Sequence, residues 1–554
     1  MIDTLRIASA QLNPIVGDLD GNLTKATTAF RRARSDAADI LVLPEQFIIG
    51  YPAEDLVLKT AVVEDCRKCA EHFAKLTGDG PAVVFNLPWR EGGLLYNTAL
   101  FMQDGQITDV RYKYHLPNYG VFDEARVFAR GPLPEPVDYR GVKIGLPICE
   151  DLWQPDVAGH LADGGAELLI SPNGSPWRRT VLSERVTTIG AKVHNEGLPL
   201  IYVNQVGGQD ELVFDGSSFA MNRDGDIVQS LRSFVEDYDV SRWHKQSAVW
   251  QCTGAACYDP LGGLEADWRA ICLGLGDYVR KNGFKQVILG LSGGIDSAMV
   301  ATIAADALGA EAVWCVMMPS LYTSGDSLGD AGDIAGRLGV RYDVIPVEPA
   351  FDAFMKMLKP HFEGTEPDMT EENIQSRIRA LSLMALSNKF GPMLITTGNK
   401  SEMATGYTTL YGDMCGGYNP LQDVYKTEVF ELAHWRNAHN PEDLLGVDNP
   451  IPDNIITKPP SAELRDNQKD SDSLPEYDRL DDILLGLIER EEPLETIIAR
   501  GHDEALVRRI QHLLYIAEYK RRQAPPGAKI GTRNFGRDRR YPVTNRYRDA
   551  ARTR

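Results

Sequence analysis

The chain has 554 residues, which at roughly 150 residues per domain corresponds to two or three domains. Its 58 Lys and Arg residues against 78 Asp and Glu residues give a formal net charge of −20, which disfavours general binding to nucleic acid or to anionic membranes. The charge is uneven, because 12 basic and 2 acidic residues lie between Lys520 and Arg554. Composition therefore favours an enzyme of small molecules with a basic C-terminal segment that needs its own explanation.

The compartment is predicted from the start of the chain and from its cysteines. Asp3 and Arg6 interrupt the first residues, MIDTLRIASAQ, so no secretory signal peptide is expected, and no apolar run approaches the roughly 20 residues that cross a bilayer. The eight cysteines are sparse and are expected to be reduced. Cys66 and Cys69 form a C-x-x-C without further metal ligands nearby, and we interpret them as one side of a helix. The prediction is a cytoplasmic protein without membrane or nucleic-acid partners.

The first half of the chain alternates short strands with helices. Apolar runs predict strands at 5–12, 39–43, 82–86, 97–102, 142–148, 167–170 and 199–204, and helical periodicity predicts a helix over 22–37. A hairpin-like turn at 102–106 adds antiparallel pairing, so a layered α/β domain is expected. The pattern weakens over 243–263, which we interpret as the boundary between domains 1–260 and 261–554.

The second half of the chain is predicted to alternate strands and helices as in repeated βαβ units. A helix is expected over 265–281, followed by strands at 286–291, 312–317, 341–345 and 392–396 with helices between them. This order predicts a doubly wound, mainly parallel α/β sheet. Ligands of such sheets bind at the carboxyl ends of the strands.

One strand-to-helix turn of the second half has the parts of a phosphate cradle: the adjacent glycines 293 and 294, two hydroxyls and the positive end of a helix dipole. It consists of Gly290, Leu291, Ser292, Gly293, Gly294, Ile295, Asp296 and Ser297. It lacks the lysine of a Walker A loop and resembles the pyrophosphate loop of the ATP pyrophosphatase superfamily, whose members adenylate a substrate. A structural strand-to-helix turn is the alternative. By resemblance, residues 290–297 would bind ATP and Asp296 would hold Mg²⁺.

Four further blocks, at 373–379, 396–402, 406–413 and 419–426, resemble the successive signatures of the NAD synthetases. The resemblance implies that Thr397 and Lys426 contact ATP, that Glu402 joins Asp296 at the metal and the dinucleotide, and that Asn373 and Arg377 hold deamido-NAD. Taken singly, each has a structural alternative: Glu402 as helix surface, Lys426 as a solvated charge and Asn373 as a helix N-cap.

The basic C-terminal segment is a candidate part of the same site. Ammonia-dependent relatives carry a lysine where this chain has Leu410, so one dinucleotide contact must come from elsewhere. The runs at 518–527 and 535–542 resemble the C-terminal segment of glutamine-dependent synthetases, and Lys520 or Lys529 would meet the dinucleotide. A solvated basic arm is the alternative.

Three predicted strand ends of the first half carry residues suited to amide hydrolysis. Cys149 would follow the strand at 142–148, with Glu45 in Leu-Pro-Glu and Lys113 in Lys-Tyr-His-Leu-Pro at two other strand ends. A thiol that attacks an amide needs a base and a positive donor for the oxyanion, which Glu45 and Lys113 can supply. A dyad of Cys149 with His115 is the runner-up.

The set Glu45, Lys113 and Cys149 resembles the catalytic triad of the nitrilase superfamily, which implies an α-β-β-α sandwich for the first domain. By the same resemblance Glu124 would support Lys113, and Tyr119 and Ser175 would hold glutamine. The pattern weakens after Ser175, where Trp177, Arg178 and Arg179 replace the usual smaller residues.

Together the two halves resemble the glutamine-dependent NAD synthetases over nearly the whole chain. The resemblance implies that ammonia, released from glutamine through a Cys149 thioester, amidates deamido-NAD after ATP has activated it, giving NAD, AMP, pyrophosphate and glutamate. It also implies homo-oligomers formed through the synthetase domain. Three alternatives stay open: another amidation, as in GMP or asparagine synthetases; a nitrilase regulated by a nucleotide sensor; and a purely structural or binding role.

Overall fold

The computed structural model describes residues 2–441, 443–465 and 468–549. Its contacts divide the chain into two compact units, Met1–Gly262 and Gly263–Arg554. Among the described residues, no helix combines the length and the apolar character needed to cross a membrane.

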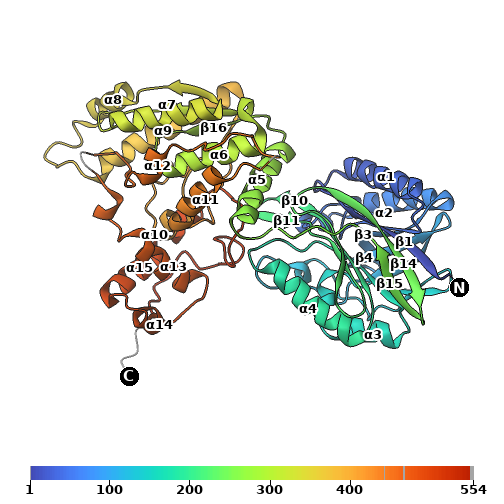
Figure 1. The fold of residues 1–554 in the computed structure, drawn as a ribbon. Helices are drawn as coiled ribbons and strands as arrows, with labels where there is room; N and C mark the ends of the chain where they lie inside the picture. The colour runs from blue at the N-terminus through green and yellow to red at the C-terminus, as the bar shows by residue number, and fades with distance from the viewer. Residues whose placement is uncertain (1, 442, 466–467, 550–554) are drawn as a thin grey trace. The chain divides into compact units, whose positions relative to one another are not determined.

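The first unit is built on two large sheets (Figure 1). The first sheet has the order β15-β14-β1-β2-β3-β4-β5 and the second the order β13-β12-β9-β8-β7-β6. The first consists of β1 (Thr4–Gln11), β2 (Ile40–Val42), β3 (Ala82–Glu91), β4 (Leu94–Gln103), β5 (Gln106–Tyr112), β14 (Asp237–Gln246) and β15 (Val249–Gly254). The second consists of β6 (Val137–Tyr139), β7 (Val142–Gly145), β8 (Leu168–Asn173), β9 (Leu200–Asn204), β12 (Phe219–Met221) and β13 (Ile227–Ser230).

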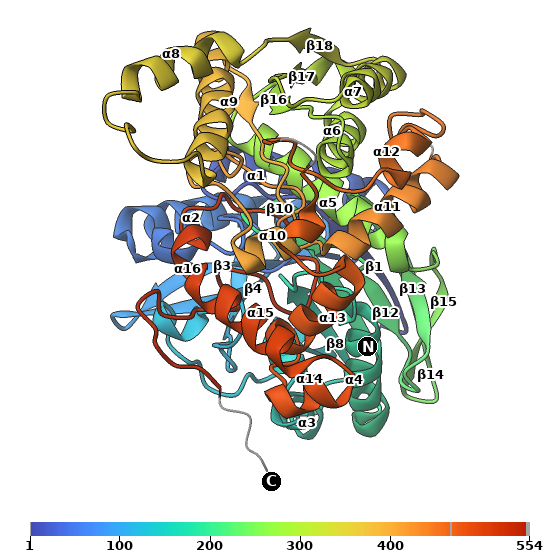
Figure 2. The same cartoon turned by 90° about the vertical axis from the view of Figure 1, so that its left-hand side faces the viewer.

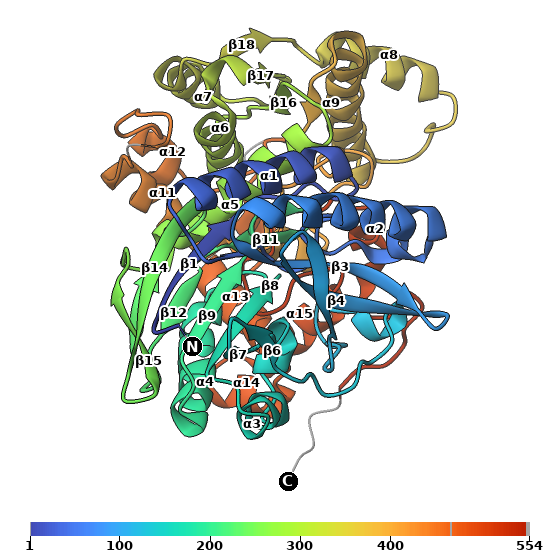
Figure 3. The same ribbon diagram turned by 90° about the vertical axis from the view of Figure 1, so that its right-hand side faces the viewer.

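Helices cover the outer faces of both sheets. Helices α1 (Leu19–Ser35) and α2 (Thr60–Ala74) lie side by side against the first sheet, and α3 (Asp156–Asp163) and α4 (Val181–Glu196) against the second (Figure 3). Alternate strand residues separate the layers: Ile40 and Val42 face the core between the sheets, whereas Leu41 faces the helices. The predicted α-β-β-α sandwich is thereby confirmed.

Two sequence predictions for this unit are wrong in detail. The segment 243–263, interpreted as the boundary because its secondary-structure pattern is weak, contains the end of β14 and all of β15. Its Trp243 and Trp250 are fully buried between the sheets. The strand predicted at 142–148 ends at Gly145, three residues earlier. The end of β7 is set by its pairing with the distant strand β8, and β14 is held by its pairing with β1, which local patterns do not report.

The second unit contains the four-stranded sheet β18-β17-β16-β19, parallel throughout, as predicted. Its strands are β16 (Val287–Gly290), β17 (Val313–Met317), β18 (Arg341–Val344) and β19 (Met393–Leu394). The chain starts at β16, adds β17 and β18 on one side and then returns to place β19 on the other. The carboxyl end of β16 is therefore the topological switch point, where ligands of such sheets bind.

Helices surround this sheet and then form a separate cluster. Around the sheet lie α5 (Gly263–Lys281), α6 (Ile295–Leu308), α7 (Gly325–Leu338), α8 (Glu348–Leu358), α9 (Met369–Phe390), α11 (Lys426–Ala438) and α12 (Asp453–Thr457). Helix α10 (Lys400–Thr405) contacts the C-terminal helices instead. The C-terminal helices α13 (Tyr477–Ile488), α14 (Leu494–Ala499) and α15 (Glu504–Ile516) pack together around a core that includes Met403 and Ala404 of α10 (Figure 2). Helix α16 (Glu518–Arg521) follows α15.

Two candidate active sites

Cys149 occupies a sharp turn after β7. It begins a short 3-10 helix, Cys149–Leu152, and has a positive backbone φ of 43°, which is costly for a residue with a Cβ. Its side chain is buried. Backbone strain of this kind clusters at functional sites, where the surrounding structure holds a reactive side chain in one orientation.

Two carboxylates from different segments of the first unit hold Lys113. Its Nζ donates to Glu45 Oε1 at 2.7 Å and to Glu124 Oε1 at 2.8 Å, and all three side chains are at most 5% exposed. Burial alone would lower the pKa of Lys113, but Glu124 and Glu45 raise it well above its ordinary value. Lys113 is therefore a permanent cation inside the first unit.

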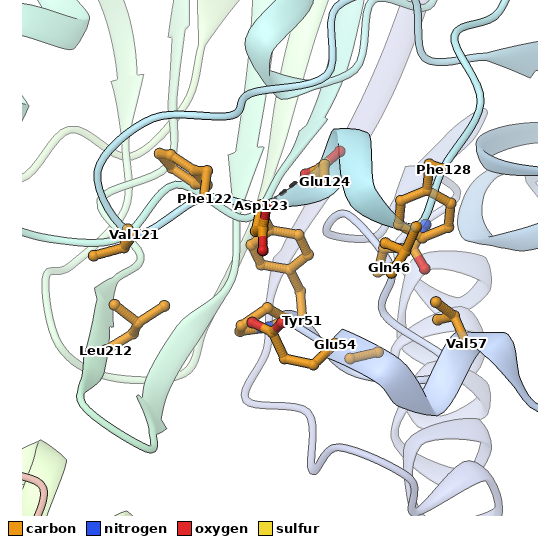
Figure 4. Close-up of a pocket in the computed structure, with 13 residues that line it drawn as sticks. Gln46, Tyr51, Glu54, Val57, Val121, Phe122, Asp123, Glu124, Phe128 and Leu212 are labelled. Carbon is orange, nitrogen blue, oxygen red and sulfur yellow. Dashed lines mark hydrogen bonds between the residues drawn. The ribbon is translucent and has the colours of Figure 1, made fainter. Parts of the chain in front are cut away.

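Neutral donors complete this cluster. Glu45 accepts from Asn97 Nδ2 at 2.7 Å and from the Gly174 backbone N–H at 2.9 Å, and Tyr51 donates to Glu124 Oε1 at 2.8 Å. The Tyr51–Glu124 bond is drawn in Figure 4, at one wall of a pocket lined by Gln46, Val57, Val121, Phe128 and Leu212 among others. Every charged group in the cluster thus has hydrogen-bond partners.

The charges of Glu45 and Lys113 in this cluster act on the Cys149 thiol. Burial raises the pKa of the Cys149 thiol, with Glu45 adding to the rise, while Lys113 and the Gly174 N–H act in the opposite direction. The thiol is therefore protonated at rest, beside a carboxylate able to take its proton. His115, the alternative partner, instead pairs through Nε2 with Asp156 Oδ1 at 2.6 Å.

Asp151 ties the two catalytic segments together. Its buried carboxylate accepts the backbone N–H groups of His115 at 2.8 Å and of Tyr114 at 3.2 Å, and on the other side that of Ile148 at 3.0 Å. The turn that carries Cys149 and the segment that carries Lys113 are thus joined through one side chain. Burial raises the pKa of Asp151 to about 6.

The two predicted glutamine contacts lie near Cys149 in different settings. Tyr119 is 56% exposed and donates to Glu150 Oε2 at 2.9 Å. Ser175, which follows β8, is buried, and its Oγ accepts from Arg185 Nε at 3.1 Å. Glu150 is a buried carboxylate next to the nucleophile, and the sequence analysis did not single it out.

The loop 290–297 of the second unit connects β16 to α6 at the switch point. Gly293 has φ +79°, and a Cβ there would lie 2.3 Å from Ser327 O, so glycine is required. Ser292 Oγ lies 3.1 Å from Ser297 Oγ and accepts from Gly294 N at 3.2 Å. Leu291 and Ile295 are buried core side chains, so these two residues can offer a ligand only their backbone.

A second buried lysine lies at the end of this loop. Lys426 Nζ forms an ion pair with Asp296 and lies 3.8 Å from Glu402 Oε1. Burial raises the pKa of Glu402 well above its ordinary value, and Asp296 adds to the rise. Asn399 Nδ2 donates to Asp296 Oδ1 at 3.1 Å, and Glu402 also closes the capping box of α10. Three predicted residues from separate signatures thus meet in one place.

Of the predicted dinucleotide residues, Glu402 lines an adjacent pocket, and the other three contact residues 408–410 at its edge. The pocket is lined by Thr397, Glu402, Thr408 and Asp413 among others. Thr408 O accepts from Lys520 Nζ at 2.7 Å, Asn373 Oδ1 accepts from Thr409 Oγ1 at 3.1 Å, and Arg377 Nε donates to Leu410 O at 3.2 Å. Asn373 lies inside α9, whose N-cap is Asp368, so the N-cap interpretation of Asn373 is wrong.

The basic C-terminal segment folds onto the second unit as far as the structure describes it, with residues 550–554 outside the described range. Lys520 is half-buried, and burial lowers its pKa although Asp413 opposes the shift. Lys529 is buried in an ion pair with Asp538 and donates to Thr532 O at 2.9 Å. Of the two predicted alternatives, Lys520 therefore lies beside the pocket residues, while Lys529 is occupied within its own segment.

Several polar contacts of these sites escaped the sequence analysis. Lys458 Nζ donates to Gly293 O at 3.1 Å and pairs with Asp330 Oδ2 at 2.8 Å, which anchors the loop 290–297 from a distant segment. Asn97 could have been predicted as a site residue from the sequence, because the polar pair Asn97-Thr98 interrupts the otherwise apolar residues 94–102 of β4. Within the described residues, no three His, Cys, Asp or Glu side chains are grouped as a preassembled metal site.

Comparison with known proteins agrees with this division. Residues 6–241 match the carbon-nitrogen hydrolase family, and residues 267–524 match the NAD synthase family. The chain is 52% identical over 550 residues to the glutamine-dependent NAD(+) synthetase of Rhodobacter capsulatus, covering 99% of this chain and 100% of that protein. It is 42% identical to the Thermotoga maritima protein of the same name, covering 98% and 99% of the two chains.

A solved structure extends the comparison to the fold. The glutamine-dependent NAD+ synthetase from Acinetobacter baumannii, solved in complex with adenosine diphosphate, is 39% identical, with a TM-score of 0.78 and coverage of 98% of this chain and 99% of that one. The fold and the side-chain clusters thus define a carbon-nitrogen hydrolase unit joined to an NAD synthase unit. The chain belongs to the glutamine-dependent NAD(+) synthetase family.

Proposed function

We propose that this protein amidates deamido-NAD to NAD with ATP and with ammonia taken from glutamine, releasing AMP, pyrophosphate and glutamate. The observation that carries the proposal is the pair of charge clusters: Glu45, Lys113 and Cys149 in one unit, and Asp296, Glu402 and Lys426 at the phosphate loop of the other. Membership of the synthetase family supplies the substrates.

In the first unit, Glu45 takes the proton of the Cys149 thiol as the sulfur attacks the amide carbon of glutamine. Lys113 donates to the oxyanion that forms, and its permanent charge suits this role. Glu45 then returns the proton to the leaving ammonia, and a thioester remains. Water, activated by Glu45, hydrolyses the thioester to glutamate.

The α-groups of glutamine are proposed to be held near the mouth of this site. Ser175 donates to an oxygen of the substrate, and Glu150, oriented by the Tyr119 hydroxyl at 2.9 Å, accepts from the α-ammonium group. Glu150→Gln would then raise the KM for glutamine, whereas it would leave ammonium-supported synthesis unchanged.

In the second unit, the loop 290–297 is proposed to bind the pyrophosphate portion of ATP through backbone N–H groups and the Ser292 and Ser297 hydroxyls. Thr397 and Lys426 bind the same nucleotide. The nicotinate carboxylate of deamido-NAD attacks the α-phosphate, pyrophosphate leaves, and ammonia then displaces AMP from the acyl-adenylate. Asn373, Arg377, Glu402 and Lys520 hold the dinucleotide, with Lys520 supplying the positive charge that Leu410 lacks.

The donor set at Asp296 and Glu402 fits Mg²⁺, a hard cation that uses one or two protein carboxylates and completes its shell with phosphate oxygens and water. Asp296 and Glu402 lie on either side of Lys426, with Asp470 adding a further negative charge nearby. When bound, Mg²⁺ would neutralise the charge of the polyphosphate.

Homo-oligomerisation through the second unit is part of the proposal. Helix α8 has no buried residue, and together with its neighbour α9 it exposes Phe354, Met357, Leu381 and Phe390. An apolar surface of this kind favours a second copy of the chain. Light scattering of the intact protein and of Leu381→Lys tests this, and the variant is expected to be smaller in mass.

A cytoplasmic location is proposed because the reaction consumes ATP and because all eight cysteines are free thiols. Thiol titration of protein freshly isolated from its own cells is expected to find them reduced.

The deciding experiment follows the nitrogen atom. The purified protein, supplied with ATP, deamido-NAD and glutamine labelled with ¹⁵N in the side-chain amide, should yield NAD whose carboxamide carries the label. Omission of ATP or of deamido-NAD should stop the product. Pyrophosphate release without amidation, or glutamine hydrolysis that leaves deamido-NAD unchanged under all conditions, would contradict the proposal.

A further inference from the structure

A buried ion pair lies behind Ser175 in the first unit. Arg185 of α4 donates through Nη1 to both carboxylate oxygens of Asp215, each at 2.9 Å, and the two side chains are 0% and 1% exposed. Asp215 ends β11 (Leu212–Asp215), which pairs with β10 (Val206–Gln209). Desolvation of two charges is unfavourable unless their remaining groups are also satisfied, so a buried pair is weak evidence for a purely stabilising role.

The remaining donors of Arg185 point at a single loop. Nε donates to Ser175 Oγ at 3.1 Å, and Nη2 donates to Ser175 O at 2.7 Å and to Pro176 O at 3.3 Å. From the other side, Asn204 accepts from Ser175 N at 2.9 Å and donates to Ser175 O at 3.0 Å. The backbone N–H, the carbonyl and the hydroxyl of Ser175 are therefore all fixed.

The chemistry of these partners decides what Ser175 can offer a ligand. A guanidinium has only donors, so Ser175 Oγ can only accept from Arg185, and its own proton stays available for an acceptor. Among the described residues the buried Tyr202 hydroxyl has no hydrogen-bond partner, so it does not take up the Ser175 proton. Gly174, the residue before Ser175, donates its backbone N–H to Glu45 Oε2 at 2.9 Å, which joins this arrangement to the catalytic cluster.

We propose that Arg185, anchored by Asp215, is a positioning residue for the amide substrate: it fixes the Ser175 loop and commits the Ser175 hydroxyl to donate to the α-carboxylate of glutamine. The amide oxygen of the substrate is already served by Lys113, which leaves the α-carboxylate as the acceptor. The inference rests on the proposed function, in which Ser175 contacts glutamine.

The test uses the full-length protein and two assays, glutamate release from glutamine and NAD formation supported by ammonium. Arg185→Lys keeps the charge but loses the planar fork that serves Asp215 and Ser175 together. It should raise the KM for glutamine about tenfold with a smaller change in kcat, and it should leave ammonium-supported synthesis unchanged. Asp215→Asn, which leaves the guanidinium in place, should act in the same direction and serves if Arg185→Lys does not fold.

A buried pair in the second unit supplies the matched control. Arg436 pairs with Asp306 at 2.7 Å, and both side chains are 0% exposed. Arg436→Lys should lower the unfolding temperature as Arg185→Lys does, with no change in the KM for glutamine. Equal KM effects from both variants, or a loss of stability at position 185 with an unchanged KM, would overturn the inference.

Ser175→Ala separates this inference from the proposed function. It should raise the KM for glutamine, and adding Arg185→Lys should then cost little more, because both changes remove the same contact. If Ser175→Ala alone leaves the KM unchanged, the proposed glutamine contact is wrong and the inference falls with it. If Ser175→Ala raises the KM while Arg185→Lys does not, only the role of Arg185 is wrong.

Discussion

The candidate site of each unit has a buried lysine between two carboxylates, and the two clusters differ in how completely they are satisfied. Lys113 lies between Glu45 and Glu124, which are 0% and 5% exposed and accept further bonds from Asn97, Gly174 and Tyr51. Lys426 lies between Asp296 and Glu402, which are 18% and 17% exposed, with the charge of Asp470 also nearby.

The difference indicates how each site is completed. The cluster around Lys113 is satisfied by the protein alone, so it is preorganised for one reaction and needs only a substrate. The cluster around Lys426 gathers Asp296, Glu402 and Asp470 around one lysine in a partly open position, and a bound cation would balance these carboxylates and the phosphates of a nucleotide. Four variants or conditions test this contrast.

The largest expected effect comes from removing the nucleophile of the satisfied cluster. Cys149→Ala should reduce glutamine-supported NAD formation by about a thousandfold or more, while ammonium-supported formation is retained. Product chromatography with each nitrogen source measures both. The exposed Cys257 provides the control, since Cys257→Ala should change neither. Loss of both activities in Cys149→Ala would falsify the division of labour between the units.

The reverse pattern is expected at the open cluster. Asp296→Ala should reduce NAD formation from either nitrogen source by about a hundredfold or more, because the polyphosphate site loses a central charge, and glutamate release should persist. Glu348→Ala, which removes an exposed charge from the first turn of α8, is the control. Restored NAD formation by Asp296→Ala with added ammonium would contradict the assignment.

Lys520 tests whether the C-terminal segment completes the dinucleotide pocket. Lys520→Ala should raise the KM for deamido-NAD about 10- to 100-fold, the range expected for one lost hydrogen bond to a charged group, and leave the KM for glutamine unchanged. Arg540→Ala removes an exposed charge of the same segment and should change neither constant. Equal changes in both KM values for Lys520→Ala would refute the contact.

The smallest expected effect is a pH dependence in the satisfied cluster. Burial raises the pKa of Glu124 from its usual 4.5 to about 7, so Glu124 is protonated below pH 7 and ionises as the pH rises through that value. Once ionised, Glu124 pairs with Lys113 as an anion and holds this lysine in position for the oxyanion. The kcat/KM for glutamine hydrolysis should therefore rise about tenfold from pH 6 to pH 8. Glu124→Gln should abolish this rise, and an unchanged pH profile would assign it to another group.

Short contiguous motifs could be predicted from the sequence because their conformation depends on neighbouring residues. The loop 290–297 must pair glycines with a helix start, and its Gly293 has the positive φ that such a turn requires. The unbroken apolar run Ile40–Val42 likewise predicts a strand that is buried on both faces. Strand ends were less predictable: the segment 142–148 leaves the sheet at Gly145, because only there does its pairing with β8 end.

The sequence by itself determined the two units, the family and the residue types that suit each reaction, since these follow from local patterns and from chemistry. Only the tertiary structure decided which further polar groups meet: that Tyr119 donates to Glu150, that Lys529 is bound to Asp538 while Lys520 donates to Thr408 of the pocket, and that Arg185 holds Ser175. None of these contacts has the spacing of neighbouring side chains on one helix or one strand face, so the folded path of the intervening chain selects them, and no local pattern encodes them.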